Sequence, residues 1–199
     1  MATPPLVKTS DLAILTGKPS TDPRLALAAQ RASDRFLGAI GYDPRAKAGD
    51  QVQLNGTGTS TLLLPAAPVT AINAVTVRGT AVWAGSGPRY RSGYWASTEL
   101  LDGPDFELDA AAGILRRNGV WPDGLGNVTV DYDHGFEELP GDIADAVLEH
   151  ATTLAMVLIH IQQESGGSTS ATYGKEATVG TTQKWVDAVE KYRLQGRQQ

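Results

Sequence analysis

Cysteine is absent from the 199 residues of this chain, and neither sign of charge dominates it. Without cysteine the protein has no disulfide, no thiol nucleophile and no thiolate zinc site, which fits a chain made in a reducing cytoplasm. The formal net charge of −5 does not match a protein that coats nucleic acid duplexes, because such a protein needs a basic surface to displace phosphate counterions.

Long hydrophobic runs are absent too. The most apolar stretch, 154–161, is far shorter than the ~20 residues that a membrane-spanning helix needs. The N-terminus lacks the basic start and the apolar core of a signal peptide. We therefore expect a soluble protein, made in a cytoplasm, with no membrane partner.

Catalytic motifs are missing as well. The sequence has no phosphate-binding glycine loop, no serine nucleophile elbow and no paired zinc histidines. His150 and His160 lie on one expected helix, where their side chains diverge by about 80°. Along a strand, Asp131 and Asp133 share one face while His134 points the other way, so these three do not converge on a metal. We predict a non-enzymatic protein without cofactor or metal.

The hydrophobic pattern changes period twice along the chain. Apolar residues at spacings of three and four predict helices over 10–17 and 22–41, and again over 140–163 and 182–194. Between about 50 and 134, alternating apolar and polar residues predict several short strands separated by Gly, Pro, Asp and Asn.

These elements predict an α+β fold. We expect a helical bundle with a long central helix, a small antiparallel β lobe inserted between the second and third helices, and a tethered C-terminal helix. The predicted domains are the N-terminal bundle helices (1–48), the β lobe (49–136), the long bundle helix (137–164), and a flexible linker with a C-terminal docking arm (165–199). The linker prediction rests on the Gly, Ser and Thr content of 165–172.

Aromatic and basic side chains crowd into one Gly- and Ser-rich segment. They are Trp83, Arg89, Tyr90, Arg91, Tyr94 and Trp95. Such a composition is typical of recognition loops and of interface hot spots. Two interpretations stay open: a contact with a partner or a sugar, and a loop whose rings cap the β lobe.

Several short segments are informative when they are taken together and in order. They are Ser10–Ala13 with the helix to Gly41, Leu62–Val69 leading to Val75–Val77, Gly113–Arg117 followed by Trp121-Pro122, Val128–Gly135, and Leu139–Ala146. This order resembles the head–tail connector (adaptor) proteins of long-tailed, siphovirus-type bacteriophages. The most specific part is a strand ending in Tyr-x-His-Gly that precedes a helix beginning Pro-x-Asp-Ile-x-x-Ala.

The resemblance implies a structural virion protein at the head–tail junction. Such a protein forms a ring, typically a dodecamer, between the portal protein and a stopper or tail-completion protein. Double-stranded DNA would pass through the ring during packaging and ejection without specific binding.

The resemblance also suggests roles for three groups of residues. Portal contacts are predicted for Trp185, Val189, Tyr192 and Arg193, which form an apolar stripe with a basic neighbour on the last helix. Stopper or tail contacts are predicted for Trp83, Arg89, Tyr90, Arg91, Tyr94 and Trp95. Glu137, Glu138 and Asp142 belong to an acidic run that would line the lumen and repel DNA. A solvated acidic face with ordinary helix-start acids is the alternative for this run.

Two other functions stay open at this stage. One is a β-sandwich carbohydrate-binding or adhesion module of a virion that uses Trp83, Tyr94 and Trp95. This function does not explain a long helix with a wide apolar stripe and a tethered terminal helix. The other is a small hydrolase with a dispersed active site.

Overall fold

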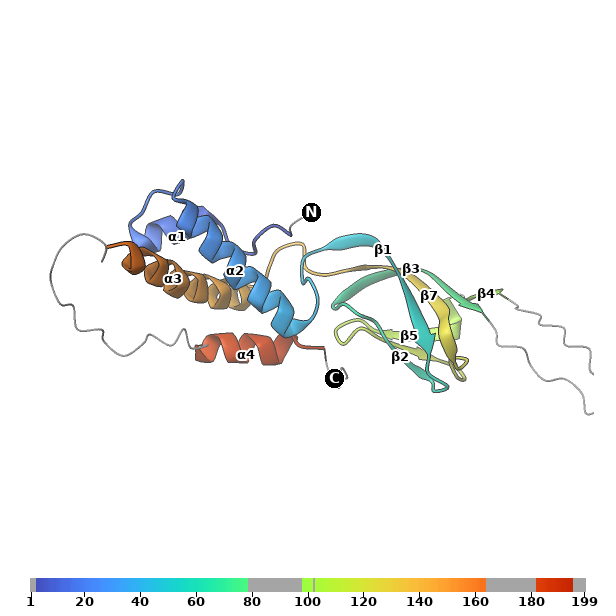
Figure 1. Ribbon diagram of the computed structural model, residues 1–199. Helices are drawn as coiled ribbons and strands as arrows, with labels where there is room; N and C mark the ends of the chain where they lie inside the picture. The colour runs from blue at the N-terminus through green and yellow to red at the C-terminus, as the bar shows by residue number, and fades with distance from the viewer. Residues whose placement is uncertain (1–2, 79–97, 102, 164–181, 195–199) are drawn as a thin grey trace, which may run out of the picture. The chain divides into compact units, whose positions relative to one another are not determined.

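The computed structural model describes residues 3–78, 98–101, 103–163 and 182–194. These residues form two compact units (Figure 1). The helical unit comprises Met1–Tyr42 and Leu139–Arg193, and the β unit comprises Asp43–Glu138. The β unit is therefore an insertion in the sequence of the helical unit.

The described residues of the helical unit form four helices. They are α1 (Thr9–Thr16), α2 (Pro23–Ile40), α3 (Gly141–Gln163) and α4 (Gln183–Tyr192). Helix α2 starts where the sequence predicts, because the Asp22 side chain accepts the N–H of Arg24 at 2.9 Å. It ends at Gly41, whose N–H bonds the carbonyl of Leu37 at 2.8 Å.

The core of the helical unit lies between α2 and α3. Its buried residues recur at three and four: Leu25, Ala28, Ala29, Ala32, Phe36 and Ile40 on α2, and Ile143, Ala146, Val147, Ala151, Leu154 and Ala155 on α3. Seven of these twelve side chains are alanine or valine. Small side chains let two helices approach closely, so each helix buries a broad face.

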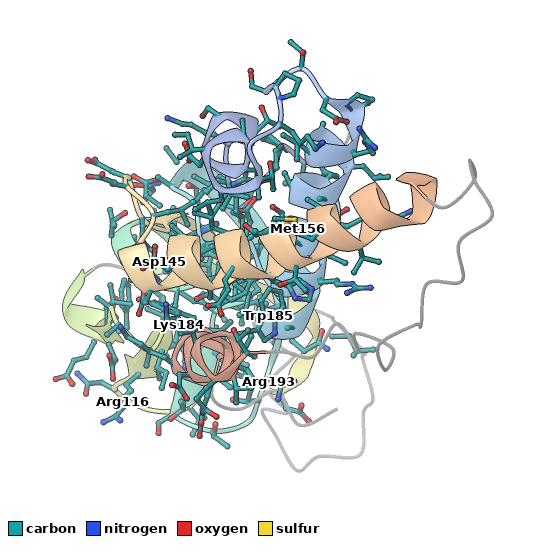
Figure 2. All side chains as sticks on the ribbon, turned by 90° about the vertical axis from the view of Figure 1, so that its left-hand side faces the viewer. Arg116, Asp145, Met156, Lys184, Trp185 and Arg193 are labelled. Atoms are coloured by element: carbon teal, nitrogen blue, oxygen red, sulfur yellow. The ribbon has the colours of Figure 1, made fainter. Side chains whose placement is uncertain are left out.

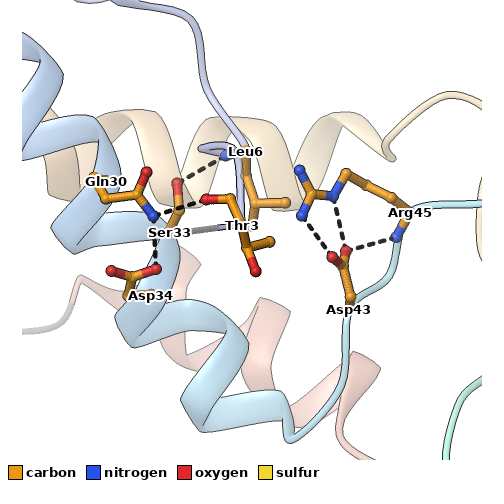
Figure 3. A network of polar contacts seen from close by, with 7 residues as sticks. All are labelled: Thr3, Leu6, Gln30, Ser33, Asp34, Asp43 and Arg45. Atoms are coloured by element: carbon orange, nitrogen blue, oxygen red, sulfur yellow. Dashed lines mark hydrogen bonds and ion pairs between the residues drawn. The ribbon is translucent and has the colours of Figure 1, made fainter. Parts of the chain in front are cut away.

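The N-terminal segment is fastened to α2 by polar contacts (Figure 3). The buried Oγ of Ser33 accepts the N–H of Leu6 at 2.8 Å. The side-chain amide of Gln30 donates to the carbonyl of Thr3 at 3.0 Å. Leu6 and Leu12 are thereby placed in the helical core.

In the part of the β unit that the structure describes, the strands form two antiparallel sheets. The four-stranded sheet has the order β1 (Lys47–Gly56), β7 (Gly124–His134), β3 (Val69–Arg78) and β4 (Thr98–Leu101). The three-stranded sheet has the order β2 (Thr61–Leu63), β6 (Ile114–Arg117) and β5 (Phe106–Asp109), and a short 3-10 helix, η1 (Gly103–Asp105), precedes β5. Both sheets contribute side chains to one core, which includes Trp121, Tyr132, Val130 and Leu115.

The predicted architecture, a helical bundle with one small β lobe, is wrong. The fold class is α+β, but strands in two sheets build a unit with its own hydrophobic core. Three of the strands are ten or eleven residues long. From Val128 to His134 every second side chain of β7 is buried, so one face of this strand is covered. Strand β7 lies between β1 and β3 in its sheet. The sequence predicts several short strands, because Gly, Pro, Asp and Asn interrupt the alternation locally.

None of the helices in the described part of the chain combines the length and the apolar character that crossing a membrane requires.

Candidate interface surfaces

Helix α4 is held to the helical unit by a buried tryptophan. The indole of Trp185 is 6% exposed and lies edge-on to Phe36 of α2, with ring centroids 5.2 Å apart. Its other neighbour is His150 of α3, at 4.6 Å between ring centroids. Figure 2 views α4 nearly end-on and shows Trp185 on the side that faces α3.

The apolar stripe of α4, for which the sequence predicts portal contacts, packs on the core of its own subunit. Trp185 is buried, and Val189 and Tyr192 are partly buried against the core of the same subunit. The sequence showed that the stripe needs a covering surface, but not that α2 and α3 supply it. The exposed side of α4 carries Val186, which is 43% exposed, and Arg193 lies exposed just beyond the helix.

Asp142, one of the predicted lumen residues, is engaged by the C-terminal segment. Lys191 donates to its carboxylate at 2.7 Å, and the hydroxyl of Tyr192 donates at 2.9 Å. Burial alone would raise the pKa of Asp142, but the hydrogen bonds from Lys191, Tyr192 and the N–H of Ile143 outweigh it and hold the pKa below its usual value.

A second pair joins the same two helices. Lys184 of α4 lies 3.8 Å from the carboxylate of Glu149 on α3. The basic C-terminal segment therefore balances part of the acidic run within its own subunit. The other predicted lumen residues, Glu137 and Glu138, are exposed in the connection between β7 and α3.

His150 is a buried titratable group that the sequence analysis set aside. It is 2% exposed, and its Nε2 lies 3.2 Å from the guanidinium of Arg35 on α2. Burial lowers the pKa of His150, and the positive charge of Arg35 lowers it further. The imidazole of His150 sits where α2, α3 and α4 meet, in surroundings that favour its neutral form. Only the packing of three helices distant in sequence reveals this environment.

The Asp131–His134 segment has the geometry that strand alternation predicts. The side-chain amide of Asn73 on β3 donates to Asp131 at 3.0 Å and to Asp133 at 2.9 Å, on one face of the sheet. His134 points to the other side and contacts Asp50 at 3.1 Å. Among the side chains that the structure describes, no group of three His, Cys, Asp or Glu converges as a metal site would require.

The segment that enters the β unit and the segment that leaves it are joined to each other by backbone hydrogen bonds. The N–H of Phe136 bonds the carbonyl of Pro44 at 2.8 Å, and the N–H of Ala46 bonds the carbonyl of Phe136 at 2.9 Å. Arg45 forms a bidentate ion pair with Asp43, seen in Figure 3, with an Nη2–Oδ2 distance of 2.5 Å. These hydrogen bonds and the ion pair hold the backbone around Arg45 and Phe136 in one conformation.

Two exposed apolar side chains that the sequence analysis missed lie near the point where the end of β1 pairs with the start of β7. The buried side chain of Asn127 accepts the N–H of Gly56 and donates to the carbonyl of Pro122, both at 2.7 Å. Val120, in the loop that precedes β7, and Leu125, near the start of β7, are 58% and 89% exposed. The only sequence signal was two apolar residues among Gly, Asn and Asp.

The aromatic–basic segment from Trp83 to Trp95 lies outside the described residues. Its connection points are described: β3 ends at Arg78, β4 begins at Thr98, and these two residues are paired.

Comparison with known proteins gives matches of structure only. No protein-family model matches the sequence. No curated protein matches it either. One similar solved structure is a chain in the neck of an empty gene transfer agent (GTA) particle computed with C6 symmetry. The TM-score is 0.50 at 17% identity, covering 92% of this chain and 88% of that chain.

Two further matches come from the same kind of particle. A chain in the virion of the native gene transfer agent particle has a TM-score of 0.50 at 16% identity, covering 96% of this chain and 89% of that chain. A chain in the neck of the native particle, computed with C12 symmetry, has a TM-score of 0.44 at 18% identity, covering 93% and 90%. The chain therefore shares its fold with chains of the neck and the virion of a gene transfer agent particle, a likeness of fold that is consistent with the resemblance to head–tail connector proteins.

Proposed function

We propose that this chain is a non-enzymatic structural protein of the neck of a tailed phage or phage-like particle, where it forms the adaptor ring between the portal and the tail. The observation that carries the proposal is the likeness to a neck chain over 92% of this chain and 88% of the other. Both units take part in a match of that extent. The C6 symmetry of that neck supports a ring whose number of subunits is a multiple of six, such as a dodecamer.

The test is assembly on a portal ring. The purified chain, mixed with the portal protein of its own particle, should add a second ring with the rotational symmetry of the portal in averaged electron micrographs. The portal alone is the control. A chain that stays monomeric with and without the portal contradicts the proposal.

Portal binding through α4 must use the outer side of the helix, because Trp185 is buried. The double substitution Val186→Asp and Arg193→Glu should abolish portal binding and leave the far-ultraviolet circular dichroism unchanged, since both side chains are exposed. Glu107→Ala, an exposed change in the β unit, is the matched control. Undiminished portal binding by the double variant rules out this surface.

Glu137 and Glu138 remain proposed lumen residues. Acidic side chains repeated around a ring add their potentials in a narrow channel and keep DNA from adhering. Particles with Glu137→Gln and Glu138→Gln should eject DNA more slowly, with a stronger dependence on salt, while Asp145→Asn on exposed α3 surface should not. Unchanged ejection by the double variant would place these acids elsewhere.

A further inference from the structure

The outer side of α2 is basic. The buried face of this helix packs on α3, and away from that face Leu27, Arg31 and Arg35 are exposed at intervals of four residues. Residues four apart are neighbours on a helix surface, so the three side chains form a row about 12 Å long. Asp34 lies beside this row and accepts a hydrogen bond from Gln30 at 2.8 Å. We call Leu27, Arg31 and Arg35 the basic row.

The outer side of α3 is acidic. Asp145 and Glu149 lie about one turn apart on the side of α3 that faces away from α2, and Met156 follows on the same side about two turns later. In Figure 2 α3 crosses in front of α2, with Asp145 and Met156 labelled along it. Lys184 lies 3.8 Å from the carboxylate of Glu149, too far for a hydrogen bond, so this acid can take a closer cation. We call Asp145, Glu149 and Met156 the acidic row.

The two rows lie on opposite sides of one helix pair. Helices α2 and α3 pack on each other through their buried faces, so the outer sides of the two helices cannot meet within one subunit. In a cyclic assembly each subunit binds its neighbours with two different surfaces. Like charges repel, so neither row suits a contact with its own copy, whereas opposite charges favour a contact between the two rows.

Each row also carries one exposed apolar side chain. Leu27 is 42% exposed and Met156 is 37% exposed. The core of a protein interface is usually apolar, with charged groups around it. The two rows therefore offer apolar contact as well as opposite charge.

We propose that the basic row of one subunit packs on the acidic row of the next copy of this chain. An antiparallel alignment of the two helices sets Arg31 opposite Glu149. The spacing of four residues that the rows share then sets Arg35 opposite Asp145, and the two apolar side chains lie at the same end of the contact. The inference rests on the proposed function, since it assigns the contact between neighbouring subunits of the ring.

An exchange of charges tests the contact. Arg31→Glu and Glu149→Arg are made as separate proteins, and rings on the portal are counted in averaged electron micrographs. Each variant alone should lose its rings, because a ring repeats the contact and so places like charges at every interface. An equal mixture should regain rings in which the two variants alternate, because each reversed side chain then faces the other. The chain that carries both substitutions should form rings by itself.

Neither reversal should disturb the subunit itself. In the part of the chain that the structure describes, Arg31 has no ion-pair partner and Glu149 has only the distant Lys184. The circular dichroism and the melting temperature of each variant should match those of the unmodified chain. Lys8→Glu, which reverses an exposed charge just before α1, is the matched control and should keep its rings. Asp145→Asn removes one attraction without adding a repulsion, so this variant should keep its rings too.

The outcomes separate the contact from the proposed function. Undiminished rings of either reversed variant alone overturn the inference and leave the proposed function intact. Reversed variants that lose their rings and do not regain them in the mixture also overturn the inference, and they assign Arg31 and Glu149 to another partner, such as DNA or the portal. Failure of the unmodified chain to form any ring on the portal overturns both.

Discussion

The rings of Trp185 and Phe36 meet edge to face, with an angle of 87° between their planes and 5.2 Å between their centroids. The two residues are far apart in sequence and belong to α4 and α2. Edge-to-face pairs of this kind add to the stabilisation from buried area. The contact therefore makes the C-terminal helix an integral part of the helical unit.

Removing the indole should destabilise the helical unit. Trp185→Ala should lower the free energy of unfolding by about 3–5 kcal/mol, because it leaves a cavity between three helices. Denaturant unfolding followed by circular dichroism measures this change. Val186→Ala, one position along on the exposed side, should change it by less than about 0.5 kcal/mol. Equal effects of the two substitutions would show that α4 does not pack as described.

His150 should make the stability of the helical unit depend on pH. Its pKa in the folded state is lowered by burial and by Arg35, so the unfolded chain binds more protons just below the ordinary histidine pKa of about 6.5. The contribution of neutral His150 to the free energy of unfolding is complete above about pH 6.5 and is lost as the pH falls below that value.

Unfolding free energies measured between about pH 5 and 7 should therefore rise with pH in the unmodified chain. His150→Gln should flatten this slope. Arg35→Gln should reduce it without removing it, because burial is the larger cause of the lowered pKa. A slope that survives His150→Gln unchanged would assign the dependence to another group.

Two glycine-to-alanine substitutions should change the free energy of unfolding in opposite directions. Gly135 has a φ of 89°, and a Cβ at this position would lie 2.2 Å from the carbonyl oxygen of Arg45. Gly135→Ala should therefore destabilise the β unit by at least about 1–3 kcal/mol. Gly38 lies inside α2 with open space around it, so Gly38→Ala should stabilise the helical unit by about 0.5–1 kcal/mol. Thermal unfolding of the two variants measures both effects, and a neutral Gly135→Ala would mean that the backbone at this turn is not held.

Local sequence patterns predicted those parts of the fold that depend on neighbours along the chain. Asp22 and Gly41 marked the ends of α2, and the apolar spacing identified the buried faces of α2 and α3. Alternation also placed Asp131 and Asp133 on the face opposite His134. These features follow from the periods of helices and strands, which are visible in the spacing of apolar and polar residues along the sequence. The predicted start of the first helix at Ser10 is one residue late, because α1 begins at Thr9 after Lys8, which forms no side-chain cap.

Only the tertiary structure decided which surfaces meet. The stripe on α4 indicated that Trp185 needs a cover, but not that Phe36 and His150 provide it. In the β unit, Val75 pairs with Val130 on one side and with Leu101 on the other. These pairings set the sheet order and leave β1 at an edge. A periodic pattern states which face of an element is buried; its partner is chosen by the packing of the whole core, because burial of apolar area has no direction of its own.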